Sequence, residues 1–373
     1  MKTFNNFVLG HYVSPEYFCD REKETERLIE VIKNERNINL ISHRRMGKTG
    51  LIFHVLHNIS HNTDYKTIYI DLLNTKNLNE FVNEFATVSL ENLESKTKKM
   101  LKQFASIVKG IRPAISINPY TGSSEMTVEV QKGYAPAMNI HELFQFLDSQ
   151  NKRIVIAFDE FQQILNYPED SVEAMLRKYI QQTKNISFIY SGSQKHLLTS
   201  MFTDYNRPFY QSAEFMFLDK IPEGEYSSFI ISNFNKGKQK IDIEGVELIL
   251  NLTKRHTYYV QFLCNRLFSL QKKTIDTALI YHTMNETLYE NRAIYYTYEK
   301  ILSKGQFELL RAISKEDNLT QPTSKDFIQN HKLSTPSSVK RALSSLLEKE
   351  MIFEDEGVYS VYDVFFSRYL ESI

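Results

Sequence analysis

The residues with the clearest chemical potential form one short segment near the start of the chain. Residues 42–49 read Ser-His-Arg-Arg-Met-Gly-Lys-Thr and directly follow an apolar run. A loop between a strand and a helix points several backbone N–H groups at one place, where the helix dipole also favours an anion. The pattern therefore predicts a phosphate-binding loop. The residues expected around the nucleotide phosphates are His43, Arg44, Arg45, Met46, Gly47, Lys48, Thr49 and Gly50.

Two residues of this loop have specific roles in phosphoryl chemistry. We expect Lys48 to reach the β- and γ-phosphates and the hydroxyl of Thr49 to bind Mg²⁺. The predicted cofactors are therefore ATP or ADP together with Mg²⁺. The motif departs from its usual form at Ser42, where a glycine normally stands. The backbone at Ser42 must therefore adopt a conformation that a β-carbon tolerates.

A pair of acidic residues supplies the second half of this chemistry. Residues 154–158 are apolar, and Asp159 and Glu160 follow them. A buried strand does not end in adjacent carboxylates without a charged or metal partner. We expect Asp159 to hold a magnesium-bound water and Glu160 to activate the water that attacks the γ-phosphate. Two solvated acids at a strand end are the alternative, which the presence of Lys48 upstream disfavours.

A third apolar run ends in hydroxyl and amide groups. Residues 190–194 read Tyr-Ser-Gly-Ser-Gln. A neighbouring strand of the same sheet would aim Ser191 at the γ-phosphate, so we expect Ser191 to bind the nucleotide. An ordinary turn between a strand and a helix is the alternative.

These side chains need a parallel sheet to bring them together. Short apolar runs bounded by polar or turn residues occur at 38–42, 66–72, 153–158, 186–191 and 214–218. Helical patterns lie between most of them, for example at 47–61 and 171–184. This alternation predicts an α/β fold with a parallel sheet, in the class of the P-loop NTPases.

The rest of the chain suggests an insertion and two further domains. From about residue 93 to 134, a lysine-rich helix and alternating residues around Asn118-Pro119-Tyr120-Thr121-Gly122 predict an inserted helix and β-hairpin. After residue 221 the strand signals stop, and residues 223–298 show helical periodicity. Three helical patterns (300–314, 324–330 and 335–350) and two short strands around Asp355-Glu356-Gly357 then predict a winged helix. We therefore expect a P-loop core at 1–221, a helical lid at 222–298 and a winged helix at 299–373.

Composition restricts the class of protein. The chain has 373 residues, of which 42% are hydrophobic, and this is enough for two or three globular domains. Its 45 basic and 45 acidic residues cancel, so no overall field attracts it to nucleic acid or an anionic membrane. Cys19 and Cys264 are its two cysteines, which argues against a disulfide framework. We find no segment typical of a signal peptide or membrane span and expect a cytoplasmic protein without a membrane partner.

Together, these motifs resemble the archaeal ATPase family, a branch of AAA-like P-loop ATPases related to the signal-transduction ATPases with numerous domains. The resemblance spans nearly the whole chain. Residues 44–49 are similar to the family's arginine-rich P-loop, residues 158–161 (Phe-Asp-Glu-Phe) to its acidic strand end, and residues 191–193 to its sensor strand. Residues 18–24 (Phe-Cys-Asp-Arg-Glu-Lys-Glu) resemble a motif near the nucleotide base, which implies that Arg21 lies close to the nucleotide.

The resemblance also implies roles for two residues outside these motifs. Arg207 stands where the family has an arginine between the sensor strand and the last core strand. Such an arginine acts on the γ-phosphate in cis or across a subunit boundary, and a structural ion pair is the alternative. Residues 255–259 (Arg-His-Thr-Tyr-Tyr) are similar to a family motif in which proline, here Thr257, normally follows the histidine. The motif implies that His256 binds a phosphate or reports lid closure, whereas a lone histidine at a helix start more often has a local structural role.

The winged helix raises the question of a macromolecular partner. Its third helix would place Ser337, Ser338, Lys340 and Arg341 where a recognition helix meets a major groove. Residues 299–373 contain ten Lys and Arg against twelve Asp and Glu, a net charge of −2. Because DNA affinity depends largely on phosphate neutralisation, the charge does not favour duplex DNA as the partner. A protein partner or self-association is at least as well supported.

The main hypothesis is a slow Mg²⁺-dependent ATPase that acts as a nucleotide-driven molecular switch. Lys48 and Glu160 would carry catalysis, with Arg207 as a further candidate. A DNA-binding ATPase or regulator that uses the winged helix is the alternative. A third hypothesis, motivated by Ser42 and Thr257, is a nucleotide-binding scaffold that does not hydrolyse ATP.

Overall fold

The chain divides into two compact units. The computed structural model describes residues 5–10, 12–92, 98–117, 124–131, 133–316 and 318–373. The core unit is Tyr12–Asp219. The C-terminal unit is Lys220–Ile373 together with the N-terminal segment up to His11. The structure separates two units and does not divide the lid from the winged helix. The predicted boundaries of three domains therefore stay a prediction.

The core unit is built on a five-stranded parallel sheet. Its strands are β1 (Ile38–Ile41), β2 (Tyr65–Asp71), β5 (Arg153–Asp159), β6 (Ile186–Gly192) and β7 (Glu214–Phe217). Their order across the sheet is β2-β5-β6-β1-β7, and every neighbouring pair is parallel. The predicted parallel sheet is therefore confirmed. Strand β6 separates the strand that leads into the phosphate-binding loop from the strand that ends in the acidic pair.

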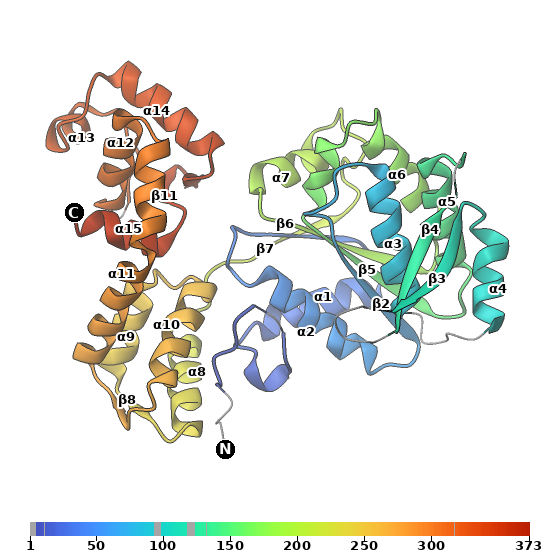
Figure 1. Cartoon of the computed structure of the whole chain (residues 1–373), viewed down its shortest axis with the longest axis horizontal. Helices are drawn as coiled ribbons and strands as arrows, with labels where there is room; N and C mark the ends of the chain where they lie inside the picture. Colours follow the sequence, from blue (N-terminus) through green and yellow to red (C-terminus); the bar gives the residue numbers. More distant parts are fainter. Residues whose placement is uncertain (1–4, 11, 93–97, 118–123, 132, 317) are drawn as a thin grey trace. The chain divides into compact units, whose positions relative to one another are not determined.

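Alternating side chains of the strands fill two hydrophobic layers. Ile154, Ile156 and Phe158 of β5 belong to one layer, whereas Val155 and Ala157 belong to the other. Helices α1 (Glu22–Lys33) and α2 (Lys48–Ser60) cover the second layer. The first layer is covered by α3 (Leu78–Asn92), α5 (Pro136–Asp148), α6 (Val172–Ile180), α7 (Lys195–Thr203) and the short 3-10 helix η2 (Phe161–Asn166). Helices on both faces leave the carboxyl edge of the sheet as the place for a site (Figure 1).

A helix and a hairpin interrupt the alternation between strands and helices. Helix α4 (Lys98–Ile107) is followed by β3 (Ile111–Ile117) and β4 (Ser124–Val130), which pair in antiparallel fashion. The ring of Phe104 on α4 packs edge-on against Phe146 of α5 at 5.0 Å. The turn expected at residues 118–122 lies outside the described residues.

The first part of the C-terminal unit is mainly helical. It contains α8 (Glu223–Lys236), α9 (Ile243–Leu252), α10 (Thr257–Ser269) and α11 (Thr277–Ile301). Two short strands, β8 (Lys240–Ile241) and β9 (Thr274–Ile275), also pair there in parallel. The prediction that strands stop after residue 221 was therefore wrong, because a strand of two residues is too short to produce a periodic pattern.

A winged helix completes the C-terminal unit, as predicted. Its elements are α12 (Lys304–Ser314), α13 (Lys325–Asn330), α14 (Pro336–Glu348), β10 (Ile352–Asp355), β11 (Val358–Val361) and α15 (Val364–Glu371). The predicted helix start at residue 300 was wrong, since α11 continues to Ile301. No Gly or Pro interrupts α11, and a capping box between Ser303 and Gln306 starts α12 instead. Helix α15 was not predicted.

No described helix combines the length and the apolar character that crossing a membrane requires.

The N-terminal segment is packed into the helices of the C-terminal unit. The ring of Phe7 is fully buried. It contacts the rings of Phe229, Phe234 and Phe268 at centroid distances of 6.2, 4.8 and 6.0 Å. The Asn265 side chain fixes the backbone there by donating to the carbonyl of Phe7 at 2.6 Å. Phe7 is thus part of the core of the C-terminal unit.

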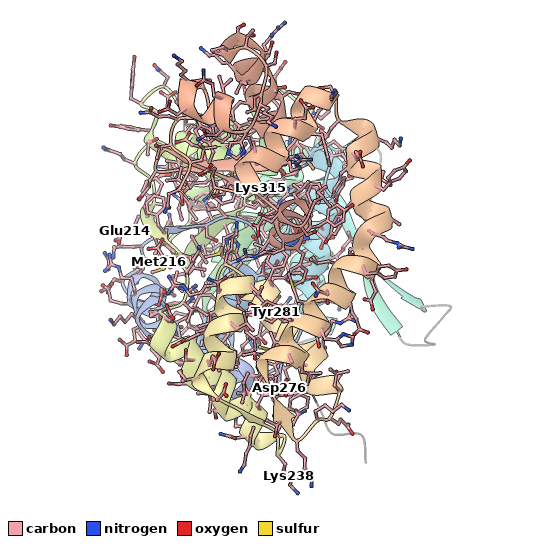
Figure 2. The ribbon with its side chains drawn as sticks, turned by 90° about the vertical axis from the view of Figure 1, so that its left-hand side faces the viewer. Glu214, Met216, Lys238, Asp276, Tyr281 and Lys315 are labelled. Atoms are coloured by element: carbon pink, nitrogen blue, oxygen red, sulfur yellow. The ribbon has the colours of Figure 1, made fainter. Side chains whose placement is uncertain are left out.

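We expect Phe7→Ala to destabilise the C-terminal unit by about 3–5 kcal/mol, because the change leaves a cavity between aromatic rings. Urea unfolding followed by circular dichroism measures this effect. Tyr281→Ala is the matched control, because Tyr281 of α11 is 51% exposed (Figure 2). Equal shifts for the two variants would contradict the packing described for Phe7.

Candidate functional site

The predicted phosphate-binding loop joins β1 to α2. Gly47 forms the N-cap of α2 with φ 94°, a left-handed conformation that favours glycine. Having no side chain, Gly47 cannot cap the first N–H groups of α2 with a side-chain oxygen. Arg45 also has a positive φ, 67°, and strained residues of this kind concentrate at functional sites. His43, Arg44 and Met46 lie in the same loop, and Gly50 lies in the first turn of α2.

Lys48 is buried at the base of this loop. Its side chain is 6% exposed, and its Nζ donates to the carbonyl oxygens of Ser42 at 2.9 Å and His43 at 3.2 Å. Burial lowers the pKa of Lys48, and the negative charges of Glu160 and Asp159 oppose this shift. Ser42, which stands where the motif usually has glycine, adds a hydroxyl that lies 3.4 Å from Lys48 Nζ.

Asp159 is the centre of the hydrogen-bond network. Its Oδ2 accepts from the hydroxyls of Thr49 and Tyr69, both at 2.9 Å. Its Oδ1 accepts from the Ser191 hydroxyl at 2.8 Å and from the backbone N–H of Glu160 at 3.0 Å. The structure thus brings together Thr49, Asp159 and Ser191, three residues that the sequence singled out separately.

Tyr69 is a site residue that the sequence reasoning missed. It lies on β2, two residues before the strand ends at Asp71, and Asp71 is in register with Asp159 of β5. Burial raises the pKa of Tyr69, and the adjacent Asp159 carboxylate raises it further. The hydroxyl therefore stays protonated and donates to Asp159. A polar side chain near the end of a strand next to the acidic strand was the available signal.

Glu160 directly follows β5, and its carboxylate bonds to Ser193, the residue after β6. Its backbone is left-handed, with φ 51° and ψ 42°. Its Oε2 accepts from the Ser193 hydroxyl at 2.8 Å, the Ser193 N–H at 3.1 Å and the Gln162 amide at 2.6 Å. Arg44 of the phosphate-binding loop donates through Nε to the Ser193 hydroxyl at 3.1 Å. Gln162 and Ser193 were not predicted as site residues.

The donor set at Thr49 and Asp159 fits a phosphate-bound Mg²⁺. Among the described residues, no group of three or more His, Cys, Asp or Glu side chains is arranged to hold a metal ion. Mg²⁺ does not require such a group, because it is usually bound through one or two protein oxygens together with phosphate oxygens and water. The hydroxyl of Thr49 and the carboxylate of Asp159 are hard oxygen ligands that lie 2.9 Å apart.

Two other predicted site residues bond to neighbouring groups within the core unit, and a third lies in the C-terminal unit. Arg21 is 3% exposed and bonds to Glu24 and to the carbonyl of Asp219. Arg207 forms an ion pair with Glu173, with 2.7 Å between Nη2 and Oε2. His256 is the buried N-cap residue of α10 and lies in the C-terminal unit. The nucleotide-related roles of these residues stay predictions.

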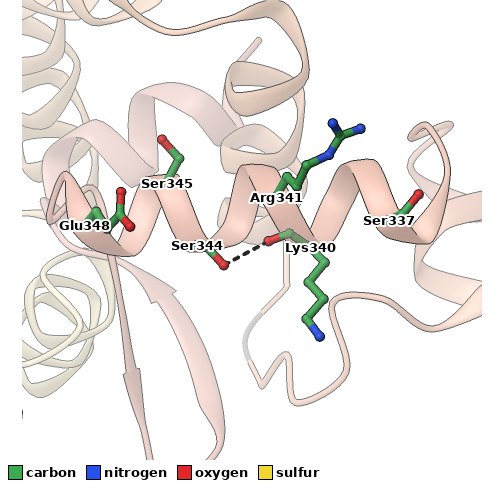
Figure 3. Close-up of a pocket in the computed structure, with 6 residues that line it drawn as sticks. All are labelled: Ser337, Lys340, Arg341, Ser344, Ser345 and Glu348. Carbon is green, nitrogen blue, oxygen red and sulfur yellow. Dashed lines mark hydrogen bonds between the residues drawn. The ribbon is translucent and has the colours of Figure 1, made fainter.

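A second candidate surface lies on α14 of the winged helix. A pocket of about 440 Å³ is lined by Ser337, Lys340, Arg341, Ser344, Ser345 and Glu348. Figure 3 shows Lys340 and Arg341 projecting from different sides of the helix, with the Ser344 hydroxyl bonded to the carbonyl of Lys340. This pocket includes two of the cations that the sequence placed on the recognition helix.

Comparison with known proteins identifies the family. A family model described as an ATPase domain predominantly from Archaea matches residues 18–253. The chain belongs to this family of archaeal ATPase domains. The matched range includes the predicted phosphate-binding loop, the acidic pair and Ser191, and the predicted resemblance is confirmed. A second model, described as a probable winged helix domain, matches residues 293–372.

Solved structures show the same fold over nearly the whole length of this archaeal-type ATPase. A Walker-type ATPase of Pyrococcus abyssi is 18% identical, with a TM-score of 0.67 and coverage of 98% of this chain and 99% of that one. The ORC2 protein of Aeropyrum pernix, solved as ADPNP–ADP complexes, is 14% identical, with a TM-score of 0.61 and coverage of 100% and 96%.

The ORC1 protein of Aeropyrum pernix, solved in complex with DNA, is also similar to this ATPase. It is 14% identical, with a TM-score of 0.52 and coverage of 95% of this chain and 94% of that one. At such identities these similarities concern the fold alone. No curated protein matches the chain significantly.

We expect Tyr69→Phe to lower the affinity for Mg²⁺ in the ATP complex about tenfold, because the change removes a hydroxyl that orients Asp159. Calorimetric titration of ATP at a series of Mg²⁺ concentrations measures the change. Tyr65→Phe is the matched control, since Tyr65 begins the same strand at its opposite end. If Tyr69→Phe keeps the wild-type Mg²⁺ dependence, Tyr69 does not orient Asp159 for the metal.

Proposed function

We propose that this protein is a slow Mg²⁺-dependent ATPase whose nucleotide state acts as a molecular switch. The observation that carries the proposal is the network around Asp159, which joins Thr49 of the phosphate-binding loop to the acidic strand end at 2.9 Å. In P-loop ATPases, a hydroxyl and a carboxylate in this relation hold Mg²⁺ against the β- and γ-phosphates. Membership in the family of archaeal ATPase domains supports the same reaction.

Four residues would each have a separate role in ATP hydrolysis. Lys48 lies at the base of the loop, where its ammonium would stabilise negative charge on the transferred phosphoryl group. Thr49 and Asp159 would hold Mg²⁺, which neutralises charge on the phosphate oxygens. Glu160, which follows Asp159 in the chain, would accept a proton from the attacking water.

Two contacts support slow turnover. The Lys48 ammonium donates to two carbonyl oxygens of its own loop, and a phosphate has to replace at least part of this bonding. Arg207, the candidate arginine finger, is engaged by Glu173. A partner that released Arg207 from Glu173 would therefore accelerate hydrolysis, as arginine fingers do in other ATPases and GTPases.

We expect Glu160→Gln to lower phosphate release by about 10²- to 10⁴-fold while ATP still binds, because the amide cannot accept the proton. Lys48→Ala should weaken ATP binding at least about tenfold, because it removes a charged donor to the phosphates. Lys33→Ala, at the exposed end of α1, is the control for removal of a lysine.

Steady-state phosphate release with Mg²⁺ and ATP, together with direct ATP binding, measures these effects. Unchanged phosphate release in Glu160→Gln would reject Glu160 as the base. ATP binding without any phosphate release in the wild-type protein would instead support the scaffold hypothesis.

A DNA-binding ATPase is the second candidate function, and the pocket on α14 is the observation that favours it. Lys340 and Arg341 line this pocket, and ORC1 of Aeropyrum pernix, which shares the fold, was solved with DNA. The net charge of −2 for residues 299–373 opposes this candidate. So do Glu354, Asp355 and Glu356, at the tip of the hairpin formed by β10 and β11.

We expect no binding of duplex DNA at physiological salt, because the winged helix does not neutralise enough phosphates. Fluorescence anisotropy at low and physiological salt, with and without ATP, tests this expectation. If binding occurs at low salt, Lys340→Glu should abolish it, whereas Lys304→Glu should not. Lys304 is a fitting control because its side chain is 90% exposed on α12, outside the recognition helix.

A further inference from the structure

The backbone at Glu160 is strained, and its surroundings hold it in place. A left-handed conformation is uncommon for a residue other than glycine and persists where neighbouring contacts determine it. At Glu160, which has φ 51°, these contacts are made by the carboxylate itself. The side chain bonds to η2, which follows β5, and to the residue after β6.

All three donors to this carboxylate converge on a single oxygen. Gln162 Nε2, Ser193 N–H and Ser193 Oγ each donate to Oε2, at 2.6, 3.1 and 2.8 Å. Oε1 takes none of these bonds. The two oxygens of Glu160 are therefore unequal: one is anchored, and the other can accept a proton.

The side chain of Gln162 is buried beside Gly192. Gln162 is 4% exposed and Glu160 is half-buried, so the bond between them is partly shielded from water. Gly192, the last residue of β6, makes the room: a β-carbon there would lie 2.0 Å from Gln162 Oε1. The φ of Gly192 is not positive, so the need for glycine at this position comes from space rather than from backbone conformation.

We propose that Gln162 is a positioning residue for ATP hydrolysis, which anchors Oε2 of Glu160 and thereby presents Oε1 to the attacking water. This inference rests on the proposed function. In the step, the water oxygen forms a bond to the γ-phosphorus as the bond to the β,γ-bridging oxygen breaks. ADP leaves with the electron pair, and one water proton passes to Oε1. Gln162 touches neither water nor phosphate and acts through Glu160.

The anchor also connects Glu160 to the phosphate-binding loop. The Ser193 hydroxyl donates to Glu160 and accepts from Arg44 Nε at 3.1 Å. The Gln162 amide bonds to Glu160 and not to the loop, so the loss of this amide should affect the orientation of Glu160 without changing the groups that hold the phosphates. This difference allows the role of Gln162 to be separated from nucleotide binding.

The test compares Gln162→Met with Gln163→Met. Methionine keeps the length of the side chain but removes the amide donor. Gln163 is the matched control, because its amide donates to the carbonyl of Thr75 at 2.9 Å and not to Glu160. We expect Gln162→Met to lower kcat about 10- to 100-fold, because a hydrogen bond to a charged group is lost, with ATP affinity within about threefold of wild type. Gln163→Met should keep the wild-type kcat.

A second variant tests the same contact from the other side. In Gly192→Ala, the new β-carbon collides with Gln162 Oε1 and should lower kcat to a similar extent. In the double variant Gln162→Met/Gly192→Ala, the effects should be clearly less than multiplicative, because both changes remove one contact. Circular dichroism confirms that each variant is folded, and Gly192→Ala replaces Gln162→Met if the latter does not fold.

The outcomes separate the inference from the proposed function. Wild-type hydrolysis that Gln162→Met and Gly192→Ala leave unchanged overturns the role of Gln162 alone. A parallel loss of ATP affinity in Gln162→Met also overturns it, because a positioning residue of Glu160 should affect kcat and not binding. If the wild-type protein releases no phosphate, both the proposed function and this inference fail.

Discussion

The site depends on the cost of burying one carboxylate. Asp159 is 4% exposed, and an ionised carboxylate without partners is strongly disfavoured at such a position. Four donors offset this cost, and they come from α2, β2, β6 and the residue after Asp159 itself. The need to hydrogen-bond one side chain of β5 thus links this strand to three other elements. The same arrangement would prepare the oxygen ligands for a metal ion bound with phosphate.

The order of the strands explains how so few residues can serve both halves of the site. Because β6 lies between β1 and β5, its end is adjacent to the phosphate-binding loop on one side and to the acidic pair on the other. Ser191 uses this position to bond to Asp159, and Ser193 uses it to bond to both Glu160 and Arg44. A different order of strands would separate the lysine from the carboxylates. Local motifs alone could not place Ser193 between them.

The sequence predicted the parts of the site that are continuous in the chain and missed those that depend on register. Lys48, Thr49, Asp159 and Glu160 belong to short motifs whose chemistry is readable directly. Tyr69 stands in a run that reads as an ordinary strand, and its role follows from the pairing of β2 with β5. The role of Gln162 was also hidden in the sequence, because the space for its side chain depends on a glycine, Gly192, on another strand. At the level of the fold, the parallel sheet and the winged helix were predictable from periodicity. The strands β8 and β9, with two residues each, were not.

The burial of Phe7 has a consequence for the cooperativity of the molecule. Phe7 precedes the core unit in sequence, yet it is part of the hydrophobic core of the C-terminal unit, which resumes at Lys220. The core unit is therefore an insertion within the C-terminal unit, tethered at both of its ends. When the core unit is folded, its two ends are held at a fixed separation. When it unfolds, the docked N-terminal segment must close a long flexible loop, and loop closure costs entropy. Folding of the ATPase core thus favours docking of Phe7 through the connectivity of the chain.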